Sequence, residues 1–354
     1  MNDIFRTRLL EEAAGMKDVP RGEGICTKEC PSNIAIVKYW GKYGEQKPRN
    51  PSLSLTLNNA LTATSIHWET GKNIRPSVRF TFAGKESPVF AERIGKYLAT
   101  LQPYLPFLSK SSLHINSVNT FPHSSGIASS ASAFGSIALL LGEIADELYG
   151  KTGEEHFLRR ASFFARLGSG SAARSIYRGM VLWGESSRYP GSSDEFAVPV
   201  QEVHQDFSDI RDSILIIDSS RKKVSSSVGH ALMEDHPYAL TRFGEADKNL
   251  GQLLEILKTG DWESFISLME HEALSLHAMM MTARPGYLLM KGGTLSVLEE
   301  VQRFRKETGL PVGFTLDAGA NVHLLYPPAV AIEIKKLTDS VLKAFCENGE
   351  VIEG

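Results

Sequence analysis

The sequence has little cysteine and no long apolar run, and each absence excludes a class of protein. Its three cysteines, Cys26, Cys30 and Cys346, are too few and odd in number for a disulfide framework, so a reducing, cytoplasmic compartment is the simpler expectation. Cys26 and Cys30 have no second ligand pair at zinc-finger spacing, which argues against a zinc site. No apolar run approaches the ~20 residues that a membrane-spanning helix needs.

An excess of charge is also lacking. The chain of 354 residues carries 38 Lys and Arg against 41 Asp and Glu, a formal net charge of -3. This balance gives no reason to expect nucleic acid or a membrane surface as a partner, so an anionic ligand would need a local basic pocket. Residues 1–15 contain acids and no apolar core, and they predict a short amphipathic helix rather than a signal peptide.

The chain has enough apolar material for a packed core, with 42% hydrophobic residues, and its length suits two domains. Residues 1–20 precede the first strand pattern and read as an appendage. Residues 185–200 are rich in Ser, Pro and Gly, which indicates a loop at or near a domain junction. We therefore predict an N-terminal domain over residues 21–205 and a C-terminal domain over residues 206–354.

Strands and helices are mixed without strict alternation, which favours an α+β fold. Alternation of apolar and polar side chains, or short apolar runs, predicts strands at 35–40, 52–68 (broken by a turn at Asn58-Asn59), 78–82, 113–118, 213–218, 313–317 and 323–326. Longer segments with few breakers predict helices at 130–149, 154–167, 226–236, 240–259, 262–281, 293–307 and 329–347, and Gly168-Ser169-Gly170 opens a further one.

The first chemically informative cluster is residues 31–42, PSNIAIVKYWGK. In a strand, Lys38, Trp40 and Lys42 would share one face. Two ammonium groups so close repel each other unless an anion lies between them, which indicates a phosphate or carboxylate site. Spacing alone favours the alternative, an edge strand that carries two ordinary solvated lysines.

The second cluster, residues 121–132 (FPHSSGIASSAS), places small residues and hydroxyls before a predicted helix. Such a loop lets a backbone approach a nucleotide, and the helix start offers free N–H groups to its phosphates. No Gly-Lys-Ser/Thr follows, so it is not a Walker loop. The alternative is a polar loop that only caps the helix.

Two further clusters present single charged groups. Residues 168–175 (GSGSAARS) bring Arg174 about one turn into a helix start, where its planar guanidinium suits a carboxylate or phosphate, or serves as a surface Arg. Residues 315–321 (TLDAGAN) present Asp317 at a strand end, where it could orient or deprotonate a hydroxyl, or simply cap the turn.

One tempting motif fails. His271-Glu272 with His277 is similar to a zinc-protease helix, but that motif needs histidines four residues apart. Six residues apart on a helix, the two rings diverge by about 120°. We interpret these residues as packing or surface residues.

Together and in this order, the clusters closely resemble the diphosphomevalonate decarboxylase family of the GHMP kinase superfamily. The family's N-I-A-x-x-K-Y-W-G-K motif corresponds to residues 33–42, and F-P-T-A-A-G-L-A-S-S-A to residues 121–131. G-S-G-S-A-x-R-S corresponds to residues 168–175, V-S-S-T-x-G-M to 224–230, and F-D-A-G-P-N to 316–321.

The resemblance covers about residues 29–345 and implies the GHMP fold: an N-terminal domain like the second domain of ribosomal protein S5, and a C-terminal α+β domain. It also implies a reaction, in which ATP, with Mg²⁺, and 5-diphosphomevalonate give isopentenyl diphosphate, ADP, phosphate and CO₂. This is a step of isoprenoid biosynthesis by the mevalonate pathway. Members commonly form homodimers in the cytoplasm.

The resemblance implies roles by position. The implied catalytic residues are Asp317 facing the 3-hydroxyl, Arg174 on the substrate carboxylate with Asn33 helping to orient it, and Lys38 near the reacting hydroxyl. The implied substrate-binding residues are Tyr39, Lys42, Ser169, Gly170 and Ser171, together with Arg174. The implied ATP-phosphate residues are Ser125, Gly126, Ser129 and Ser130, and no protein residue is assigned as a metal ligand.

The sequence departs from the family at three places. His123, Ser124 and Ser125 replace Thr-Ala-Ala, which bears on ATP affinity, and Ala320 replaces Pro, which loosens the turn after Asp317. Residues 1–20 lie outside the family core. Three rivals remain: a kinase of the superfamily that only phosphorylates the 3-hydroxyl, a decarboxylase of the monophosphate, and a non-catalytic ligand sensor.

Overall fold

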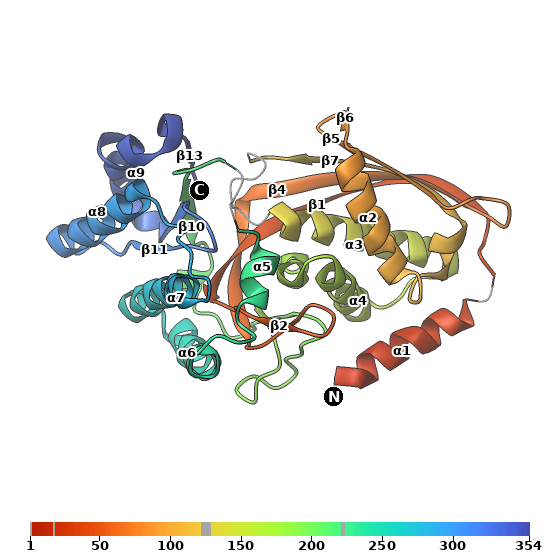
Figure 1. Cartoon of the computed structure of the whole chain (residues 1–354), viewed down its shortest axis with the longest axis horizontal. Helices are drawn as coiled ribbons and strands as arrows, with labels where there is room; N and C mark the ends of the chain where they lie inside the picture. Colours follow the sequence, from red (N-terminus) through yellow and green to blue (C-terminus); the bar gives the residue numbers. More distant parts are fainter. Residues whose placement is uncertain (1, 17, 122–128, 221–223) are drawn as a thin grey trace.

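The computed structural model describes residues 2–16, 18–121, 129–220 and 224–354 (Figure 1). Its α-helices are α1 Asn2–Gly15, α2 Pro88–Leu101, α3 Ser129–Tyr149, α4 Glu154–Gly168, α5 Ser226–Ala231, α6 Ala239–Thr259, α7 Trp262–Thr282, α8 Gly292–Thr308 and α9 Ala331–Ser340. Short 3₁₀ segments are η1 Pro106–Lys110, η2 Gly170–Ile176, η3 Gln205–Phe207, η4 Pro328–Val330, η5 Leu342–Phe345 and η6 Glu347–Gly349.

Strands form two larger sheets and a hairpin. The first sheet contains β1 Gly22–Val37, β4 Ser52–Thr70, β5 Ser77–Phe82, β6 Lys85–Glu86, β7 Ser111–Asn119, β8 Met180–Trp183 and β9 Val198–Pro199. The second contains β10 Arg211–Leu215, β11 Gly313–Thr315, β12 Val322–Tyr326 and β13 Val351–Ile352, and the hairpin is β2 Lys42–Tyr43 with β3 Lys47–Pro48. The mixed α+β class that the sequence predicts is confirmed.

The first sheet has the order β6-β5-β7-β4-β8-β9, and β1 pairs with β4. Helices α2, α3 and α4 lie together on one side of it (Figure 1). Helix α3 fits closely because its residues are small: a Cβ on Gly135 would lie 2.5 Å from Cys30 Sγ. The sheet and its helices form one core that continues into α6 and α7, so the two halves of the chain pack on each other.

Strand β1 carries the chain into the space between the two halves. Its first half alternates between partly buried and exposed residues, whereas every residue from Cys30 to Val37 is buried. The register with β4 shifts between Pro31 and Asn33, where a proline without an N–H is tolerated. The strand ends at Val37, so the prediction that Lys38, Trp40 and Lys42 share one strand face is wrong; Lys38 follows β1 and Lys42 begins β2.

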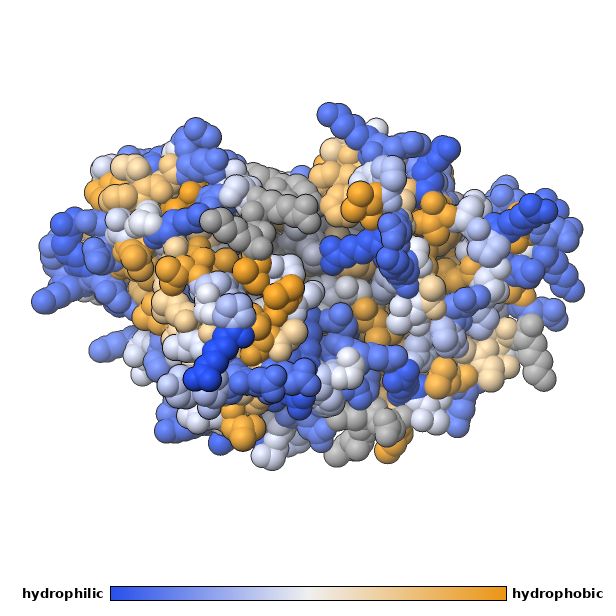
Figure 2. Space-filling model, in the orientation of Figure 1, coloured by the Kyte–Doolittle hydropathy of each residue, from blue (hydrophilic) through white to orange (hydrophobic). Residues whose placement is uncertain are grey.

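The second sheet has the order β11-β12-β10-β13 and packs against α7 and α8 (Figure 1). Between β11 and β12 lies the tight turn that contains Asp317, and it faces the end of β1. Figure 2 shows the face of the molecule that is turned to the viewer in Figure 1. Hydrophobic side chains gather there on the C-terminal half, while the outer helix ends are mainly hydrophilic. No helix of the described ranges combines the length and apolarity needed to span a bilayer.

Several predicted elements need correction. The turn at Asn58-Asn59 is wrong, because β4 runs unbroken from Ser52 to Thr70; Asn59 instead donates from Nδ2 to the carbonyl oxygen of Asp212 at 2.8 Å. The helix predicted at 226–236 ends at Ala231, and the chain continues in tighter turns in which the N–H groups of Met233 and Glu234 donate to the carbonyl oxygens of His230 and Ala231. The segment after Gly168 is the 3₁₀ segment η2, and the last predicted helix is the shorter α9.

Helix α1, over the predicted appendage, packs on the first domain. Leu9 and Ala13 are buried on its inner face, and the Phe5 ring lies 4.7 Å from that of Phe196. Arg6 forms an ion pair with Glu45 at 2.9 Å, in the loop of the β2–β3 hairpin. The segment therefore contributes to stability through apolar contacts.

Deletion of residues 1–20 is expected to lower Tm by several degrees and to leave kcat nearly unchanged. The Tm should fall because burying one Leu or Phe side chain stabilises the fold by about 1.5–3 kcal/mol. The kcat should change little because the described contacts of α1 include none with the side chains at the end of β1. Calorimetry and turnover of the truncated protein measure both. A folded but inactive truncated protein would mean that α1 supports the hairpin in catalysis.

Candidate active site

A cleft of about 690 Å³ lies between the two halves of the molecule. Its walls come from the end of β1, the start of α3, the segment η2, helix α5 and the turn after β11. The sequence-predicted residues that line it are Lys38, Tyr39, Lys42, Ser129, Ser130, Ser169, Ser171, Arg174 and Asp317. The fold thus brings together groups that lie up to 279 residues apart in the chain.

The centre of the cleft is an ion pair between Lys38 and Asp317. Lys38 Nζ donates to Asp317 Oδ1 at 2.9 Å; the lysine side chain is 1% exposed and the aspartate 31% exposed. Burial lowers the pKa of Lys38, while Asp317 opposes that effect. Burial also acts to raise the pKa of Asp317, but Lys38, His323 and Arg174 outweigh it, so the pKa lies below its ordinary value. Near neutral pH the aspartate is therefore a carboxylate, with its more exposed side toward the cleft.

The turn that presents Asp317 is fixed by hydrogen bonds from buried side chains. Its carbonyl oxygen contacts His277 Nε2 at 3.1 Å, and Thr294 Oγ1 donates to the carbonyl oxygen of Ala320 at 2.7 Å. Asn321 Oδ1 accepts from the backbone N–H groups of Ile217 and Asp218. These bonds hold the turn at the position where Ala320 departs from the family pattern.

Arg174 is fixed beside this pair in a buried position. Its Nε and Nη2 donate to Asn33 Oδ1 at 3.3 and 3.2 Å, and Nη1 donates to Ser52 Oγ. Asn33 Nδ2 in turn donates to Ser175 Oγ at 2.8 Å and to the carbonyl oxygen of Ser171 at 3.1 Å. Each terminal nitrogen of the guanidinium has a second N–H, so Arg174 can still donate twice toward the cleft that it lines. Asn33 is buried behind Arg174 and does not line the cleft.

Tyr39 and the GSGS segment form the adjoining wall. The Tyr39 ring stacks on His230 with centroids 4.9 Å apart and meets Trp183 edge-on. Burial raises the pKa of Tyr39 to about 12, so its phenol remains a donor at physiological pH. A Cβ on Gly170 would lie 2.7 Å from Trp183, so glycine is required there for packing, and Gly170 itself does not line the cleft.

Lys42 lines the cleft near Arg93. Its Nζ donates to Gln46 Oε1 at 2.7 Å across the β2–β3 hairpin. Burial, together with the nearby positive charge of Arg93, lowers the pKa of Lys42 to about 8. Lys42 and Arg93 lie near each other, and neither forms an ion pair with a carboxylate among the described residues that line the cleft. This part of the cleft is therefore suited to an anion.

We expect kcat/KM to fall as pH rises above about 8, because Lys42 then loses the proton that attracts an anionic substrate. Below that pKa the ammonium is intact, so the loss is confined to the alkaline limb. A Lys42→Arg variant should move the limb to higher pH, since arginine stays charged. Steady-state kinetics between pH 6 and 10 measure the fall of kcat/KM at alkaline pH. If Lys42→Arg shows this fall at the same pH as the parent, a group other than Lys42 causes it.

The implied phosphate loop is only partly described. Ser129 and Ser130 begin α3 and line the cleft, as a helix start that faces phosphates would. Ser125 and Gly126, together with the His123 and Ser124 departures, lie outside the described residues. Nothing in the structure bears on them.

Some cleft residues were not found from the sequence. His230 lines the cleft; its Nδ1 accepts from the Gly41 N–H at 3.0 Å, and burial keeps its pKa well below the ordinary value. Arg93, in a helix that the sequence analysis did not predict, adds a cation. Phe80, Phe82 and Phe90 form an apolar wall near the start of α3. Two features of the sequence could have indicated them: His230 stands where the family motif has Met, and Phe80 and Phe82 are two residues apart and so share one face of a strand.

Metal-binding side chains are not clustered in the part of the chain that the structure describes: no group of three or more His, Cys, Asp or Glu could hold an ion there. His271 is exposed and pairs with Glu245, whereas His277 is buried and contacts the Asp317 carbonyl oxygen. These placements agree with the interpretation of both histidines as surface or packing residues. Cys26, Cys30 and Cys346 are free thiols.

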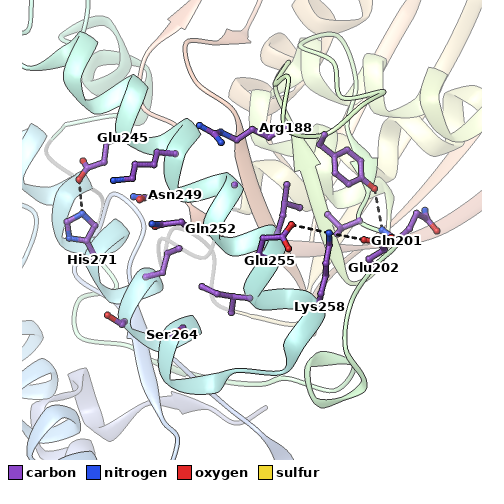
Figure 3. Close-up of a pocket in the computed structure, with 18 of the residues that line it drawn as sticks. Arg188, Gln201, Glu202, Glu245, Asn249, Gln252, Glu255, Lys258, Ser264 and His271 are labelled. Carbon is purple, nitrogen blue, oxygen red and sulfur yellow. Dashed lines mark hydrogen bonds and ion pairs between the residues drawn. The ribbon is translucent and has the colours of Figure 1, made fainter.

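A larger, open groove of about 1440 Å³ lies elsewhere, between residues 188–202 and helices α6 and α7 (Figure 3). Charged side chains of both signs surround it, and Lys258 and Glu255 form an ion pair there. Its lining shares no residue with that of the cleft. The smaller cleft, with its fixed ion pair and converging cations, is the better candidate for chemistry.

Comparison with known proteins shows the family of this chain. Residues 30–197 match the diphosphomevalonate decarboxylase-like N-terminal domain, and residues 213–353 match the mevalonate 5-diphosphate decarboxylase C-terminal domain. The diphosphomevalonate decarboxylase of Eremothecium gossypii is 30% identical over 85% of this chain and 77% of its own length; the human enzyme is 29% identical over 85% and 76%.

Solved structures show the same fold. The mevalonate diphosphate decarboxylase of Staphylococcus aureus superposes with a TM-score of 0.78 at 28% identity, covering 93% of this chain and 95% of that one. A structure described as MDDEF in complex with MVAPP, AMPPCP and magnesium gives 0.78 at 26% identity, covering 94% and 96%.

The mixed α+β fold and the interdomain cleft define an enzyme of the GHMP kinase type. Within that class, the two matched domain models and the curated relatives place the chain in one family. The chain belongs to the diphosphomevalonate decarboxylase family.

Proposed function

We propose that this enzyme decarboxylates 5-diphosphomevalonate at the expense of ATP, giving isopentenyl diphosphate, ADP, phosphate and CO₂. The observation that carries the proposal is the Lys38–Asp317 pair beside the fixed guanidinium of Arg174 in a single cleft. The family membership and the relatives that bear this name support it. The MDDEF complex with MVAPP and an ATP analogue supports the pairing of the two substrates.

In this reaction Arg174 binds the substrate carboxylate through its two remaining N–H groups. A carboxylate that is about to leave as CO₂ must be held in line with the bond that breaks, and a bidentate guanidinium does this better than a point charge. Asn33 and Ser52 keep Arg174 in place, so the holding geometry exists before the substrate arrives.

Asp317 and Lys38 act on the 3-hydroxyl. A hydroxyl is a poor leaving group, so ATP first phosphorylates it: the hydroxyl oxygen bonds to the γ-phosphorus, its proton leaves to solvent, and ADP departs. Asp317 Oδ2, the oxygen not bonded to Lys38 in the described pair, aligns the hydroxyl for this transfer. The C3–O bond then breaks with loss of phosphate while the carboxylate leaves as CO₂, and the bonding electrons form the new double bond. Positive charge that builds at C3 is stabilised by the Asp317 carboxylate.

ATP is placed with its phosphates at the start of α3 and its base against the Phe80–Phe90 wall, which offers aromatic contact. The Mg²⁺ that accompanies ATP fits the cleft as a companion of the nucleotide. Magnesium in such sites keeps several waters and is held mainly by phosphate, and Ser129 and Ser130 provide hydroxyls there. When bound, it neutralises phosphate charge.

The three rivals give different products. A kinase that stops after phosphorylation would release ADP without CO₂, and a ligand sensor would release neither. The joint presence of Arg174 and Asp317 favours decarboxylation over phosphorylation alone, because only the elimination needs the carboxylate held. An assay of ADP, phosphate and CO₂ with 5-diphosphomevalonate separates these cases; ADP released in the absence of CO₂ would overturn the proposal.

We expect the diphosphate to be preferred over the monophosphate by at least ~10² in kcat/KM. Tyr39, Lys42, Ser169 and Ser171 offer more donors than one phosphate requires, and a buried donor left without a partner costs about 1–3 kcal/mol. Side-by-side turnover of 5-phosphomevalonate and 5-diphosphomevalonate at saturating MgATP measures this preference. Lys42→Ala should narrow the gap, whereas the exposed Lys72→Ala should not; equal turnover by the parent enzyme would favour the monophosphate rival.

We also propose that the enzyme is a cytoplasmic homodimer with domains near 21–205 and 206–354. The three free thiols suit a reducing compartment. Exposed apolar side chains on the C-terminal half, among them Tyr238, Leu240 and Leu288, suit self-association. Light scattering after size-exclusion chromatography gives the mass in solution, and a monomer at micromolar concentration would contradict the dimer.

A further inference from the structure

The backbone of Lys38 is held from the opposite half of the molecule. Its N–H donates to Glu272 Oε2 at 2.8 Å, and its carbonyl oxygen accepts from Arg242 Nη2 at 3.2 Å. Glu272 belongs to α7 and Arg242 to α6, so both partners are C-terminal. Asn50 Nδ2 adds a third bond, to the same carbonyl oxygen, at 3.0 Å.

Lys38 needs these partners because the β-ladder ends just before it. The register between β1 and β4 runs to Val37, which pairs with Leu53, and does not extend to Lys38. A buried backbone N–H or carbonyl without a partner is costly, so each must be bonded elsewhere. The backbone at the strand end, from which the lysine side chain leaves, is therefore held by α6 and α7 together with Asn50 rather than by the β-ladder.

Glu272 and Arg242 form a buried pair, and Arg242 Nη1 also lies 3.7 Å from Glu245 Oε2. Glu272 is 0% exposed and Arg242 is 1% exposed. Arg242 Nη1 donates to Glu272 Oε1 at 2.9 Å, Nη2 donates to Oε2, and Asn249 Nδ2 donates to Oε1 at 2.6 Å. Buried ion pairs are often no more stabilising than well-packed apolar residues of similar volume, because desolvation offsets their attraction. Stability alone is therefore a weak account of this pair.

We infer that Glu272 and Arg242 are positioning residues, which clamp the Lys38 backbone so that its ammonium meets Asp317 across the interdomain cleft. The inference rests on the proposed function, in which Lys38 and Asp317 act on the reacting hydroxyl. It also links the halves of the molecule: α6 and α7 hold the lysine, and the turn after β11 holds the aspartate. A shift of the helices would move the ammonium relative to its partner.

The charge of Glu272 acts on Lys38 as well. The charged groups that face Lys38 are Asp317 from the β11–β12 turn, Arg174 from η2, and Glu272 and Arg242 from α7 and α6. Burial lowers the pKa of Lys38, and the carboxylates of Asp317 and Glu272 oppose that effect. Removal of the Glu272 charge should therefore lower this pKa further, so that Lys38 loses its proton at a lower pH.

The neighbouring residue His271 provides a matched control. It lies on α7 beside Glu272 in sequence, its side chain is 56% exposed, and it pairs with Glu245 of α6 at 2.9 Å at the open groove (Figure 3). The His271–Glu245 pair thus joins the same two helices as the clamp, and Glu245 also lies 3.7 Å from Arg242, so the control alters the surroundings of the clamp while leaving its bonds to Lys38 in place. None of its described bonds is made to Lys38.

The test compares Glu272→Gln, the double variant Arg242→Met/Glu272→Met, and His271→Ala with the parent enzyme. Displacement of a reacting group by about 1 Å can cost ~10² in rate, so we expect both clamp variants to lose roughly 10²-fold in kcat. KM for ATP should change little, because the ATP phosphates are placed at α3. In Glu272→Gln the alkaline limb of kcat should move to lower pH, and His271→Ala should behave like the parent.

The double variant addresses stability, because apolar replacement of both members of a buried pair commonly preserves the fold. A clamp variant that is folded by calorimetry and keeps the parent's kcat and pH profile would overturn the inference. If the parent itself releases no CO₂, the proposed function fails. The clamp is then judged by NMR of ¹³Cε-lysine, with the Lys38 signal assigned from Lys38→Arg. A titration midpoint lowered by Glu272→Gln but not by His271→Ala supports the clamp; equal midpoints overturn it.

Discussion

Replacement of Asp317 by asparagine is expected to lower kcat by at least ~10³-fold in a protein that still folds. The amide keeps the shape and an oxygen that can accept from Lys38 Nζ, but it carries no negative charge. The charge that would align the hydroxyl and stabilise the cationic centre at C3 is therefore lost, and preorganised charge of this kind is commonly worth several kcal/mol in an enzyme site. The buried ammonium of Lys38 also loses its counter-charge, which favours its neutral form.

The measurement is single-turnover release of CO₂ and ADP by the purified variant, with its fold checked by circular dichroism and Tm. Asp339→Asn is a matched control, since Asp339 is an exposed aspartate on α9 that pairs only with surface lysines in the described contacts. A near parental kcat for the folded Asp317→Asn variant would remove Asp317 from the chemistry. Loss of CO₂ release with ADP release retained would assign the carboxylate to the second step alone.

The sequence was sufficient for the long elements, because their patterns are strong. Helices α6 and α7 begin and end within one residue of the predicted bounds, since long amphipathic segments with a glycine or aspartate at their ends leave little choice. The path of β1 and β4 was harder. Two asparagines look like a turn, but Asn59 is bonded across to the C-terminal half, and such a tertiary contact leaves no local signal.

For the site, the motifs predicted which residues meet but not what holds them. Lys38, Arg174 and Asp317 do line one cleft, although the reasoning about a shared strand face was wrong. Asn33 lies behind Arg174, and Gly170 serves packing against Trp183. Glu272 was taken for a packing or surface residue, because spacing along a helix cannot indicate that a carboxylate points at a strand end 234 residues earlier.

Arg174→Lys is expected to keep ATP binding and to lose roughly 10²- to 10³-fold in kcat. The guanidinium makes described bonds to Asn33 and Ser52 and still has two N–H groups for a carboxylate, whereas an ammonium has three donors from a single point. A lysine there would leave Asn33 Oδ1 or Ser52 Oγ without the bond that it accepts from Arg174, or would turn away from the substrate. It would also lie buried near Lys38, where burial and a like charge favour the neutral amine and so weaken the hold on the carboxylate.

Two measurements separate a catalytic from a structural role for Arg174. Nucleotide affinity by calorimetry should equal that of the parent, because the described residues proposed to bind the ATP phosphates belong to α3, while CO₂ release at saturating substrate should fall. Arg178→Lys is the matched control, since Arg178 is exposed and lies four residues further along the chain, just after η2. If Arg174→Lys decarboxylates like the parent, a positive charge is sufficient for decarboxylation and the planar guanidinium with its two N–H donors is not required. Arg174 would then act mainly by packing over Tyr39, whose ring centroid lies 5.4 Å from its guanidinium carbon. If ADP release persists while CO₂ release fails, the enzyme has been reduced to a kinase, which is the result expected if Arg174 holds the carboxylate that leaves.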